Sequence, residues 1–313
     1  MNILVTGIGG DIGDSIGRIL RGSGVADRLI GCDIHDRHLG KFVFDECYLL
    51  PRADAPDYLD RLVGLARVTG VDLIIPASEP EQRSLKSQEV LREIDGIPLI
   101  IANRESLDVG FDKLRTAQFL EANGLPFPWT RRVDTEDPRE LPCIIKSRFG
   151  AGSKQVGRVE RSEMVAAYRV ISPDYIWQEQ VGTVDEEYTC GVFGSRACET
   201  RVIAFRRRLN GGITASGEAV EDREIDRLCR AIADALMLEG SINVQLRMTE
   251  RGPVVFEINP RFSSTVIFRH RLGFCDVLWS ISSRIEGRVA PYDGSGTVGA
   301  RIFRKFEEVI LEN

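Results

Sequence analysis

The sequence predicts an α/β protein, in which a Rossmann-like N-terminal domain is followed by a unit of two α+β lobes. Three segments support this fold class. Residues 2–33 alternate between strand, glycine-rich turn, helix and strand, which is the order of a βαβ unit. Residues 141–156 contain a buried strand, a glycine-rich loop and a second strand. Residues 241–247 and 254–262 have the pattern of two polar-faced strands that form a hairpin.

The N-terminal glycine-rich turn, residues 6–13, lies between an apolar strand at 2–5 and a helix with Ile16 and Ile19 on its apolar stripe. Glycines let the backbone turn tightly and approach a ligand, and a helix N-terminus favours anions. Short-chain dehydrogenases share this spacing, but they also need a Tyr-x-x-x-Lys pair. No tyrosine in this chain has a lysine four residues later. We therefore expect no nicotinamide cofactor, and leave open whether the turn binds a substrate.

Two further apolar stretches, residues 70–76 and 98–101, are predicted as strands of the same domain. Ser78 and Glu79 follow the first of them, at the carboxyl end where open α/β sheets bind ligands. Glu79 fits equally well as an acid in the first turn of a helix. We expect the domain to end near Val109.

A more specific signal is the strand that ends in Lys146 and runs into a glycine-rich loop. The ammonium of Lys146 suits a nucleotide phosphate, and the loop with Gly150, Gly152 and Ser153 could cap phosphates with backbone N–H groups. The loop is not a Walker loop, because no Gly-Lys-Ser/Thr follows and no helix begins there. The alternative is a β-hairpin with a basic tip.

Glu257, Asn259 and Arg261 are two residues apart, so an extended chain projects them from one face. A carboxylate and an amide oxygen are hard ligands that suit Mg²⁺, with Mn²⁺ as an alternative, and a guanidinium suits phosphate. The preceding strand carries Gln245, which could meet Glu257 across the hairpin. The alternative is a pair of amphipathic strands with a solvated polar face.

Gln245 followed by the run from Glu257 to Arg261 resembles the metal-binding end of ATP-grasp ligases, most closely the carbamoyl-phosphate-synthase-like branch. The resemblance implies three segments: a Rossmann-like pre-ATP-grasp domain (1–109), a small lobe with the glycine-rich flap (110–181) and a C-terminal lobe with the Mg-ATP and substrate site (182–313). It also implies ATP as the nucleotide and the following contacts. Lys113, at a helix start, would approach the phosphates, Glu179 and Val181 would hold adenine at the lobe hinge, and Glu187 would bind the ribose, with Glu186 as an alternative.

Arg206 and Arg208 belong to a basic run that enters a glycine-containing segment, residues 211–217, which we expect to be a flexible loop. They could hold an acidic substrate or the oxygens of an acyl phosphate, and the alternative is a solvated arginine face. The resemblance implies an ATP-dependent carboxylate–amine, or carboxylate–thiol, ligase that forms an acyl phosphate and releases ADP and phosphate. A carbamoyl-phosphate-synthase-like phosphoryl-transfer enzyme and a non-catalytic ATP-binding subunit remain alternatives.

Composition limits the class of partner. The 313 residues carry 41 Lys and Arg against 47 Asp and Glu, a net charge of −6, which argues against a nucleic-acid binder. We find no apolar run long enough to cross a bilayer and no signal-peptide pattern. The seven cysteines are scattered and form no C-x-x-C motif, which suggests a reducing compartment. The three histidines have no zinc spacing. We expect a cytoplasmic enzyme that acts on small carboxylates and amines and that could form a homodimer.

Overall fold

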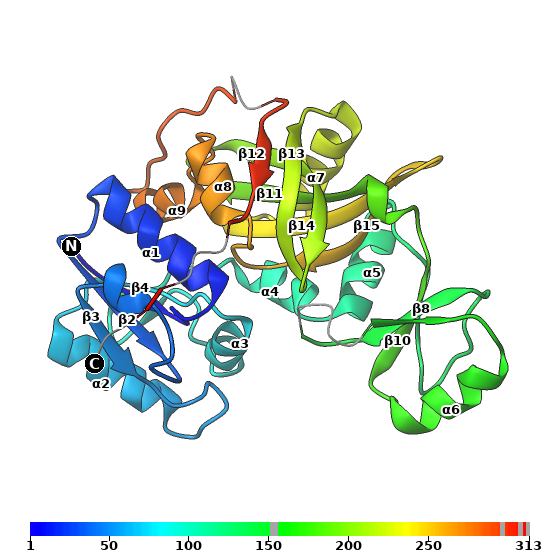
Figure 1. The fold of residues 1–313 in the computed structure, drawn as a ribbon, viewed down its shortest axis with the longest axis horizontal. Helices are drawn as coiled ribbons and strands as arrows, with labels where there is room; N and C mark the ends of the chain where they lie inside the picture. The colour runs from blue at the N-terminus through cyan, green and yellow to red at the C-terminus, as the bar shows by residue number, and fades with distance from the viewer. Residues whose placement is uncertain (151–155, 295–297, 306–308, 311–313) are drawn as a thin grey trace.

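The computed structural model describes residues 1–150, 156–294, 298–305 and 309–310 of the chain. Its strands form three main sheets, and in Figure 1 the six-stranded sheet lies between the two four-stranded ones. The strand orders are β3-β2-β1-β4, β7-β10-β8-β9 and β15-β14-β11-β12-β13-β16. No helix in the described part of the chain is long and apolar enough to span a membrane.

The first sheet is parallel, and its helices pack against it as predicted for a Rossmann-like domain. Its strands are β1 (Asn2–Thr6), β2 (Arg28–Asp33), β3 (Glu46–Leu49) and β4 (Leu73–Ile75). Its helices are α1 (Asp11–Ser23), α2 (Tyr58–Thr69) and α3 (Glu79–Ser87), with a 3₁₀ turn, η1 (Gly40–Phe42), before β3. The α/β fold class and the parallel order of this sheet are therefore confirmed.

The strand predicted at 98–101 is much reduced. β6 (Ile97–Pro98) pairs only with β5 (Glu93–Ile94), and one parallel bridge links Leu99 to Ile74 of β4. Ile100 and Ile101 are nevertheless buried, because the segment passes between the first sheet and the rest of the chain. α4 (Arg104–Gly110) then leads to the second sheet.

The second sheet is a small antiparallel one, at the right of Figure 1. Its strands are β7 (Thr130–Arg132), β8 (Cys143–Ser147), β9 (Val156–Val159) and β10 (Tyr175–Glu179). α5 (Lys113–Ala122) precedes these strands, and α6 (Glu163–Ile171) lies between β9 and β10. The core on one side of this sheet is formed by Trp177, Ile145 and their neighbours. The apolar alternate positions of β8 and β10 explain why both strands form.

The third sheet is the largest and is antiparallel. Its strands are β11 (Glu187–Ser195), β12 (Cys198–Asn210), β13 (Ile213–Val220), β14 (Gly240–Thr249), β15 (Gly252–Asn259) and β16 (Arg301–Phe303), and a 3₁₀ turn, η2 (Val184–Glu186), precedes β11. α7 (Arg223–Ala235) buries Ile225, Leu228 and Ile232 against it. The predicted hairpin of β14 and β15 is present, and Gln245 pairs directly with Glu257.

The predicted flexible loop at 211–217 is instead a tight hairpin between β12 and β13. Gly211 and Gly212 alone form the turn, with φ of 60° and 83°, and the residues after them already belong to β13. Both glycines therefore have the left-handed backbone conformation that the turn requires, which residues with a side chain rarely adopt. Residues 213–220 are fixed by pairing with β12 and β16.

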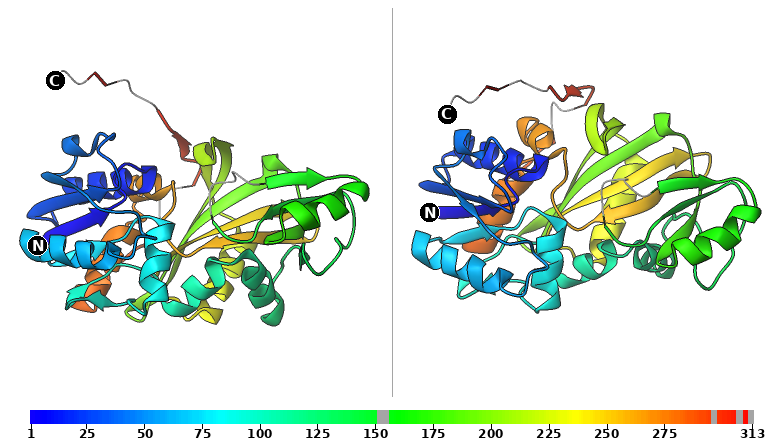
Figure 2. Two further views of the ribbon diagram at one scale, coloured as in Figure 1. Left: turned by 90° about the horizontal axis from the view of Figure 1, so that it is seen from below. Right: turned by 60° about the horizontal axis from the view of Figure 1, so that its bottom comes forward.

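The last two helices return to the N-terminal sheet. α8 (Val266–Arg271) and α9 (Asp276–Glu286) lie beside α1 in both views of Figure 2. Val266, Val277 and Ile281 join Ile3 and Val5 in one buried cluster. The segment predicted as a single lobe, residues 182–313, thus contains both the large sheet and two helices that cover the N-terminal domain.

Candidate functional site

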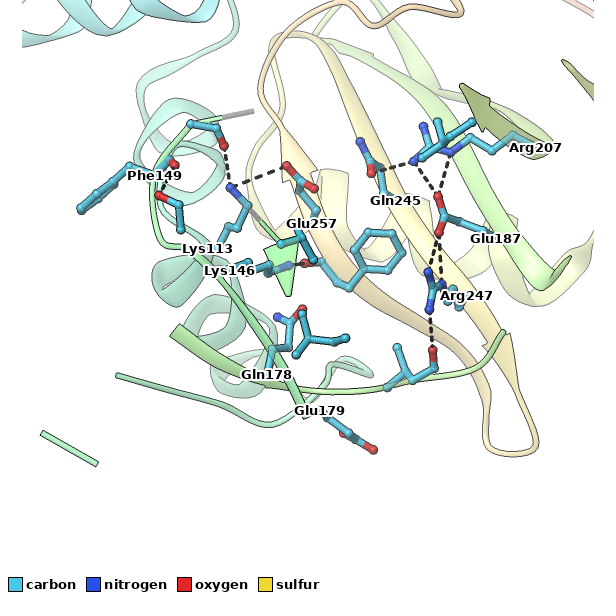
Figure 3. Close-up of a pocket in the computed structure, with 17 residues that line it drawn as sticks. Lys113, Lys146, Phe149, Gln178, Glu179, Glu187, Arg207, Gln245, Arg247 and Glu257 are labelled. Atoms are coloured by element: carbon cyan, nitrogen blue, oxygen red, sulfur yellow. Dashed lines mark hydrogen bonds and ion pairs between the residues drawn. The ribbon is translucent and has the colours of Figure 1, made fainter. Parts of the chain in front are cut away.

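A cavity of about 420 Å³ lies between the second and third sheets (Figure 3). β8, β9 and β10 contribute one wall, and β11, β12, β14 and β15 contribute the other. α5 closes one end through Lys113. The lining residues are Lys113, Ile144, Lys146, Ser147, Phe149, Gly150, Val156, Gln178, Glu179, Val181, Glu187, Arg207, Leu209, Gln245, Arg247, Phe256 and Glu257.

The structure brings most of the predicted site residues into this one cavity. Those that line it are Lys113, Lys146, Gly150, Glu179, Val181, Glu187, Gln245 and Glu257. Asn259, Arg261, Arg206 and Arg208 are absent from its lining, and the last two lie on the opposite side of their strand. Gly152 and Ser153 lie outside the described residues, so their predicted place in the flap remains a prediction.

Lys146, near the end of β8, is buried inside the cavity wall with 5% of its surface exposed. Its Nζ donates to the carbonyl oxygen of Phe256 at 3.1 Å. Burial lowers the pKa of Lys146 to about 8, although the attraction of Glu257 opposes this effect. A buried ammonium with one neutral acceptor is poorly solvated. An anion in the cavity would therefore stabilise its charged form.

Lys113 is held at the cavity mouth by the start of α5. Its Nζ donates to the carbonyl oxygen of Gly150 at 2.6 Å and lies 3.8 Å from Oε1 of Glu257. Asp112 caps the helix by accepting from the Leu114 N–H at 3.0 Å. Arg148, just after β8, donates to both carboxylate oxygens of Asp112 at 2.8 and 2.6 Å. This bidentate pair fixes the helix start, and thus Lys113, against the strand that carries Lys146.

The predicted metal ligands are a carboxylate, Glu257, and two amides, Gln245 and Asn259. Glu257 and Gln245 face each other across β14 and β15, and both side chains line the cavity. Oε1 of Gln245 accepts from Nη2 of Arg207 at 2.8 Å, and this oxygen has a second lone pair that a metal ion could use. The described residues contain no group of three or more His, Cys, Asp or Glu that could hold a metal. The donor set fits Mg²⁺ all the same, because Mg²⁺ takes few protein oxygens when phosphates supply the others.

Asn259 and Arg261 lie just past the cavity, where β15 ends. Asn259 is buried and pairs with Asn243 of β14. Nη2 of Arg261 donates weakly to Oδ1 of Asn259 at 3.4 Å, and its Nε lies 4.0 Å from Oε2 of Glu79. Glu79 is the first residue of α3, as the helix-start interpretation predicted, and it also binds Arg83. Arg261 thus lies where the large sheet meets the N-terminal domain.

Glu187 is buried between two arginines, as Figure 3 shows. Its Oε1 accepts from Nε and Nη2 of Arg207 at 3.2 and 3.0 Å. Its Oε2 accepts from Nε and Nη2 of Arg247 at 3.1 and 2.9 Å. Each carboxylate oxygen has about two acceptor positions, so guanidinium N–H groups occupy the full capacity of this carboxylate. A ribose hydroxyl would have to share an oxygen that is already engaged.

The structure places Arg207 in the cavity instead of its neighbours Arg206 and Arg208. Strand β12 alternates, so Arg207 falls on the face of Ile203 and Phe205, and it is 6% exposed. Arg206 and Arg208 are about half exposed and pair with acids at the surface, Glu186 and Glu218 for Arg206 and Asp185 for Arg208. The prediction of Arg206 and Arg208 as site cations is therefore not supported by their position, and the solvated-face alternative describes both.

Glu179 ends β10 and is fixed by two bonds. Its Oε2 accepts from the Trp129 N–H at 3.1 Å, and its Oε1 accepts from Arg251 at 2.6 Å. The chain then turns at Gly182, where φ is 50° and an added Cβ would lie 2.9 Å from the Met248 carbonyl oxygen. This close approach lets the Val181 carbonyl oxygen accept from Arg247 at 3.1 Å. The segment that joins the two sheets is thereby tied to β14.

Sequence reasoning missed nine of the lining residues, among them Arg207, Arg247 and Phe256. The face shared by Gln245 and Arg247 could be read from their spacing, and Arg207 follows from the alternation that includes Ile203. Phe256 had no such signal. The β14–β15 register shifts after Gln245, so Val255 pairs with Leu246 while Glu257 pairs with Gln245. Phe256 is the extra residue of this bulge, and a bulge can place two consecutive side chains on one face.

Comparisons with known proteins agree with this geometry. The ATP-grasp domain family matches residues 111–265, which contain all the lining residues. The D-alanine–D-alanine ligase of Mycolicibacterium smegmatis is 26% identical over 254 residues, which cover 68% of each chain. A probable α-L-glutamate ligase of Xanthomonas euvesicatoria pv. vesicatoria is 29% identical over 212 residues, which cover 61% of this chain and 70% of the relative.

A solved structure extends the likeness to the N-terminal sheet. The biotin carboxylase domain of the Hydrogenobacter thermophilus 2-oxoglutarate carboxylase, in complex with MgADP, ADP and bicarbonate, aligns with a TM-score of 0.75 at 14% identity. The alignment covers 96% of this chain and 73% of that chain, and at this identity it shows the fold. The family match over the cavity identifies residues 111–265 as an ATP-grasp domain, and the ligases named above are relatives of this chain.

Proposed function

We propose that the protein is an ATP-dependent carboxylate–amine ligase that forms an acyl phosphate and releases ADP and phosphate. The observation that carries the proposal is the position of two lysines, Lys113 and Lys146, beside Glu257 in a cavity between two sheets. Cations suited to phosphate and a carboxylate suited to Mg²⁺ lie together within the ATP-grasp domain. No side-chain nucleophile is required for this chemistry, because the substrate carboxylate attacks ATP itself.

In this proposal, Lys113 and Lys146 bind the phosphates of ATP. Glu257, with Gln245 and Asn259, would hold Mg²⁺, which supplies charge neutralisation on the phosphate oxygens. The low pKa of Lys146 supports its role, since an ammonium that is poorly solvated gains most from a phosphate partner. The backbone at Gly150 accepts a hydrogen bond from Lys113 and would cover the phosphates on the side of that lysine.

Residues at the joint between the two sheets would hold the nucleoside. Glu179 and Val181 line the cavity and are held by Trp129, Arg251 and Arg247, so a base would meet a pre-ordered wall. The ribose role of Glu187 needs a revision. We propose that Glu187 acts mainly by positioning Arg207 and Arg247, whose remaining N–H groups are available to the nucleotide.

The reaction follows from these positions. A carboxylate oxygen of the substrate attacks the γ-phosphorus of ATP. The bond between the γ-phosphorus and the β–γ bridging oxygen breaks, and ADP leaves. The amine then attacks the acyl carbon, loses a proton, and expels phosphate. Negative charge develops on the transferred phosphoryl group, where fixed cations stabilise it. Lys146 and Arg207 would neutralise this charge in the cavity, and Arg261 would meet the acyl oxygens at its edge.

The substrates we propose are small carboxylates and amines, and amino acids are the first to test because the relatives' names are those of D-alanine–D-alanine and α-L-glutamate ligases. The order Gln245, Glu257, Asn259 and Arg261 supports the carbamoyl-phosphate-synthase-like branch as the nearest group within the superfamily. We also propose the division into residues 1–109, 110–181 and 182–313, with the middle segment closing on the nucleotide.

The test is capture of the acyl phosphate by hydroxylamine. Protein, Mg-ATP and a panel of acids that includes D-alanine and L-glutamate are incubated with hydroxylamine, and hydroxamates are measured. At least one acid should give a hydroxamate together with ADP. Lys146→Ala should lose this product, whereas Lys41→Ala, a change at an exposed lysine on η1, should retain it. ATP consumption that yields a stable phosphorylated hydroxyl compound, with no hydroxamate from any acid, would refute the ligase assignment.

A further inference from the structure

A second large cavity lies in the N-terminal domain, at the carboxyl edge of its parallel sheet. Its volume is about 930 Å³, and it is separate from the nucleotide cavity. The turns after β1 and β2, the segment that follows β3, and α3 surround it. Figure 1 shows these elements on the opposite side of the molecule from β8 and β10. Ligands of open α/β sheets bind at this edge, where the strand order reverses.

The glycine-rich turn has the structural context that a ribose-binding fingerprint requires. It follows β1, opens α1, and precedes β2, which pairs in parallel with β1. An added Cβ on Gly13 would lie 2.3 Å from the Gly7 carbonyl oxygen, so Gly13 is needed for the helix to approach the turn. Asp33 is the last residue of β2 and lies 20 positions after Gly13. An acid at that point binds ribose hydroxyls in dinucleotide-binding folds.

Asp33 is held ready for a diol. Its Oδ2 accepts from the Gly9 N–H at 2.8 Å, and its Oδ1 accepts from the Ile34 N–H at 2.7 Å. Each oxygen keeps one further acceptor position, so the two can receive adjacent hydroxyls, with Nε2 of His35 at 3.8 Å from Oδ1 as the neighbouring polar group. An added Cβ on Gly9 would lie 3.1 Å from Oδ2, so a side chain there would crowd this carboxylate.

Ile34 supplies an apolar surface next to this carboxylate. It is 54% exposed and lines the cavity, in contrast to the buried apolar residues that precede it on β2. Leu50, Pro51 and Ala53 line the cavity as well. Large exposed apolar residues beside a polar anchor are typical of ligand cavities. A planar base would cover Ile34 while its ribose reached Asp33.

The floor of the cavity is fixed by a buried carboxylate. Glu81 accepts from Thr6 at 2.7 Å and from Tyr58 at 3.0 Å, so β1, α2 and α3 are joined beneath it. The start of α1 is acidic, with Asp11 and Asp14 in its first turn. Such a helix start disfavours a phosphate, because like charges would lie close together.

From these observations we propose that the N-terminal cavity is a second ligand site, which takes a ribonucleoside with its diol on Asp33 and its base against Ile34. The site is independent of the proposed ligase chemistry, because none of its groups belongs to the Mg-ATP cavity. Its ligand class is a neutral ribosyl compound. The two arginines that line the cavity, Arg52 and Arg83, are already paired with Asp54 and Glu79, and the start of α1 is acidic. We therefore predict that a 5′-phosphate adds nothing to the affinity.

Equilibrium dialysis tests the proposal with the nucleotide cavity saturated by Mg-ADP, using labelled adenosine and uridine as probes. At least one probe should bind with one equivalent per chain, and its 2′-deoxy analogue should bind at least about tenfold more weakly, since one charge-assisted hydrogen bond is lost. The 5′-monophosphate should bind no more tightly than the nucleoside. A monophosphate that binds much more tightly, or a deoxy analogue that binds equally well, would overturn the assignment of Asp33.

Variants locate the binding. Asp33→Asn should weaken the probe at least about tenfold, whereas Asp36→Asn, the same charge change at an exposed residue outside the cavity, should leave it unchanged. Asp33→Asn could disturb the turn, so Ile34→Ser is the second variant, because it keeps every hydrogen bond of Asp33. Weakening in both, with unchanged Mg-ADP binding, supports the site. Wild-type binding in Ile34→Ser, or no ribonucleoside binding at millimolar concentration, refutes it.

Discussion

Replacing Arg207 with methionine should damage both the stability of the fold and the binding of ATP. The change removes three hydrogen bonds of a buried guanidinium: two donated to Oε1 of Glu187 and one to Oε1 of Gln245. Methionine fills much of the same volume without a charge. Glu187 would then keep only the two bonds from Arg247.

The magnitude follows from burial. Removing one partner from a buried ion pair costs about 3–5 kcal/mol, because the other charge stays buried. Arg247 still compensates Glu187 here, so we expect a loss of about 2–4 kcal/mol in the free energy of unfolding. Arg206→Met is the matched control, since it removes the neighbouring guanidinium from an exposed pair, which is worth about 0–1 kcal/mol. ATP affinity should fall about tenfold or more in Arg207→Met, equal to about 1.4 kcal/mol, and remain unchanged in Arg206→Met.

Urea unfolding followed by circular dichroism gives the free energy of unfolding, and calorimetric titration with Mg-ATP gives the ATP affinity. The two variants differ only in which face of β12 they alter. Equal destabilisation by both, or an ATP affinity that falls more in Arg206→Met, would refute the assignment of Arg207 to the site.

Four further predictions concern the same cavity. Nucleotide binding should take up protons between about pH 8 and 9, because phosphates restore the charge of Lys146, whose pKa is about 8. Calorimetry in buffers of different ionisation enthalpy measures the proton uptake, and Lys146→Met should abolish the uptake. Without nucleotide, the unfolded chain binds more protons at Lys146 than the folded chain between about pH 8 and 10.5, so the free energy of unfolding should rise with pH in that window relative to Lys146→Met. Glu257→Gln should reduce turnover at least about tenfold, or 1.4 kcal/mol, with an unchanged melting temperature. Turnover that stays near the wild-type value at limiting as well as saturating Mg²⁺ would contradict the metal assignment. Arg148→Met should destabilise the fold by about 2–3 kcal/mol and weaken ATP binding, because it releases the helix start that holds Lys113. Arg158→Met, at an exposed ion pair, should do neither.

The fold and much of the site could be predicted because local patterns specify them. Alternation along two strands was enough to place Gln245 opposite Glu257, since a hairpin with a short turn has few registers. Lys146 was identified by its position at the end of an apolar strand before a glycine-rich loop. These features depend on neighbours in sequence, and the structure brings both into one cavity.

The remaining features depend on contacts that are distant in sequence. Arg206, Arg207 and Arg208 have the same chemistry, and the pairing of β12 with β11 and β13 decides which face of the strand meets the cavity. The bulge at Phe256 depends on how β14 and β15 pair, and no residue type there signals it. The saturation of Glu187 by two arginines and the return of α8 and α9 to the N-terminal sheet are likewise long-range results.

The central claim is that the cavity transfers the γ-phosphoryl group of ATP to a carboxylate. The most direct measurement follows ¹⁸O from a labelled carboxylic acid that supports turnover with an amine. Attack by the carboxylate oxygen predicts that each released phosphate carries one ¹⁸O, seen by mass spectrometry, and that the nucleotide product is ADP. Phosphate without the label, or AMP and pyrophosphate as products, would contradict the acyl-phosphate mechanism.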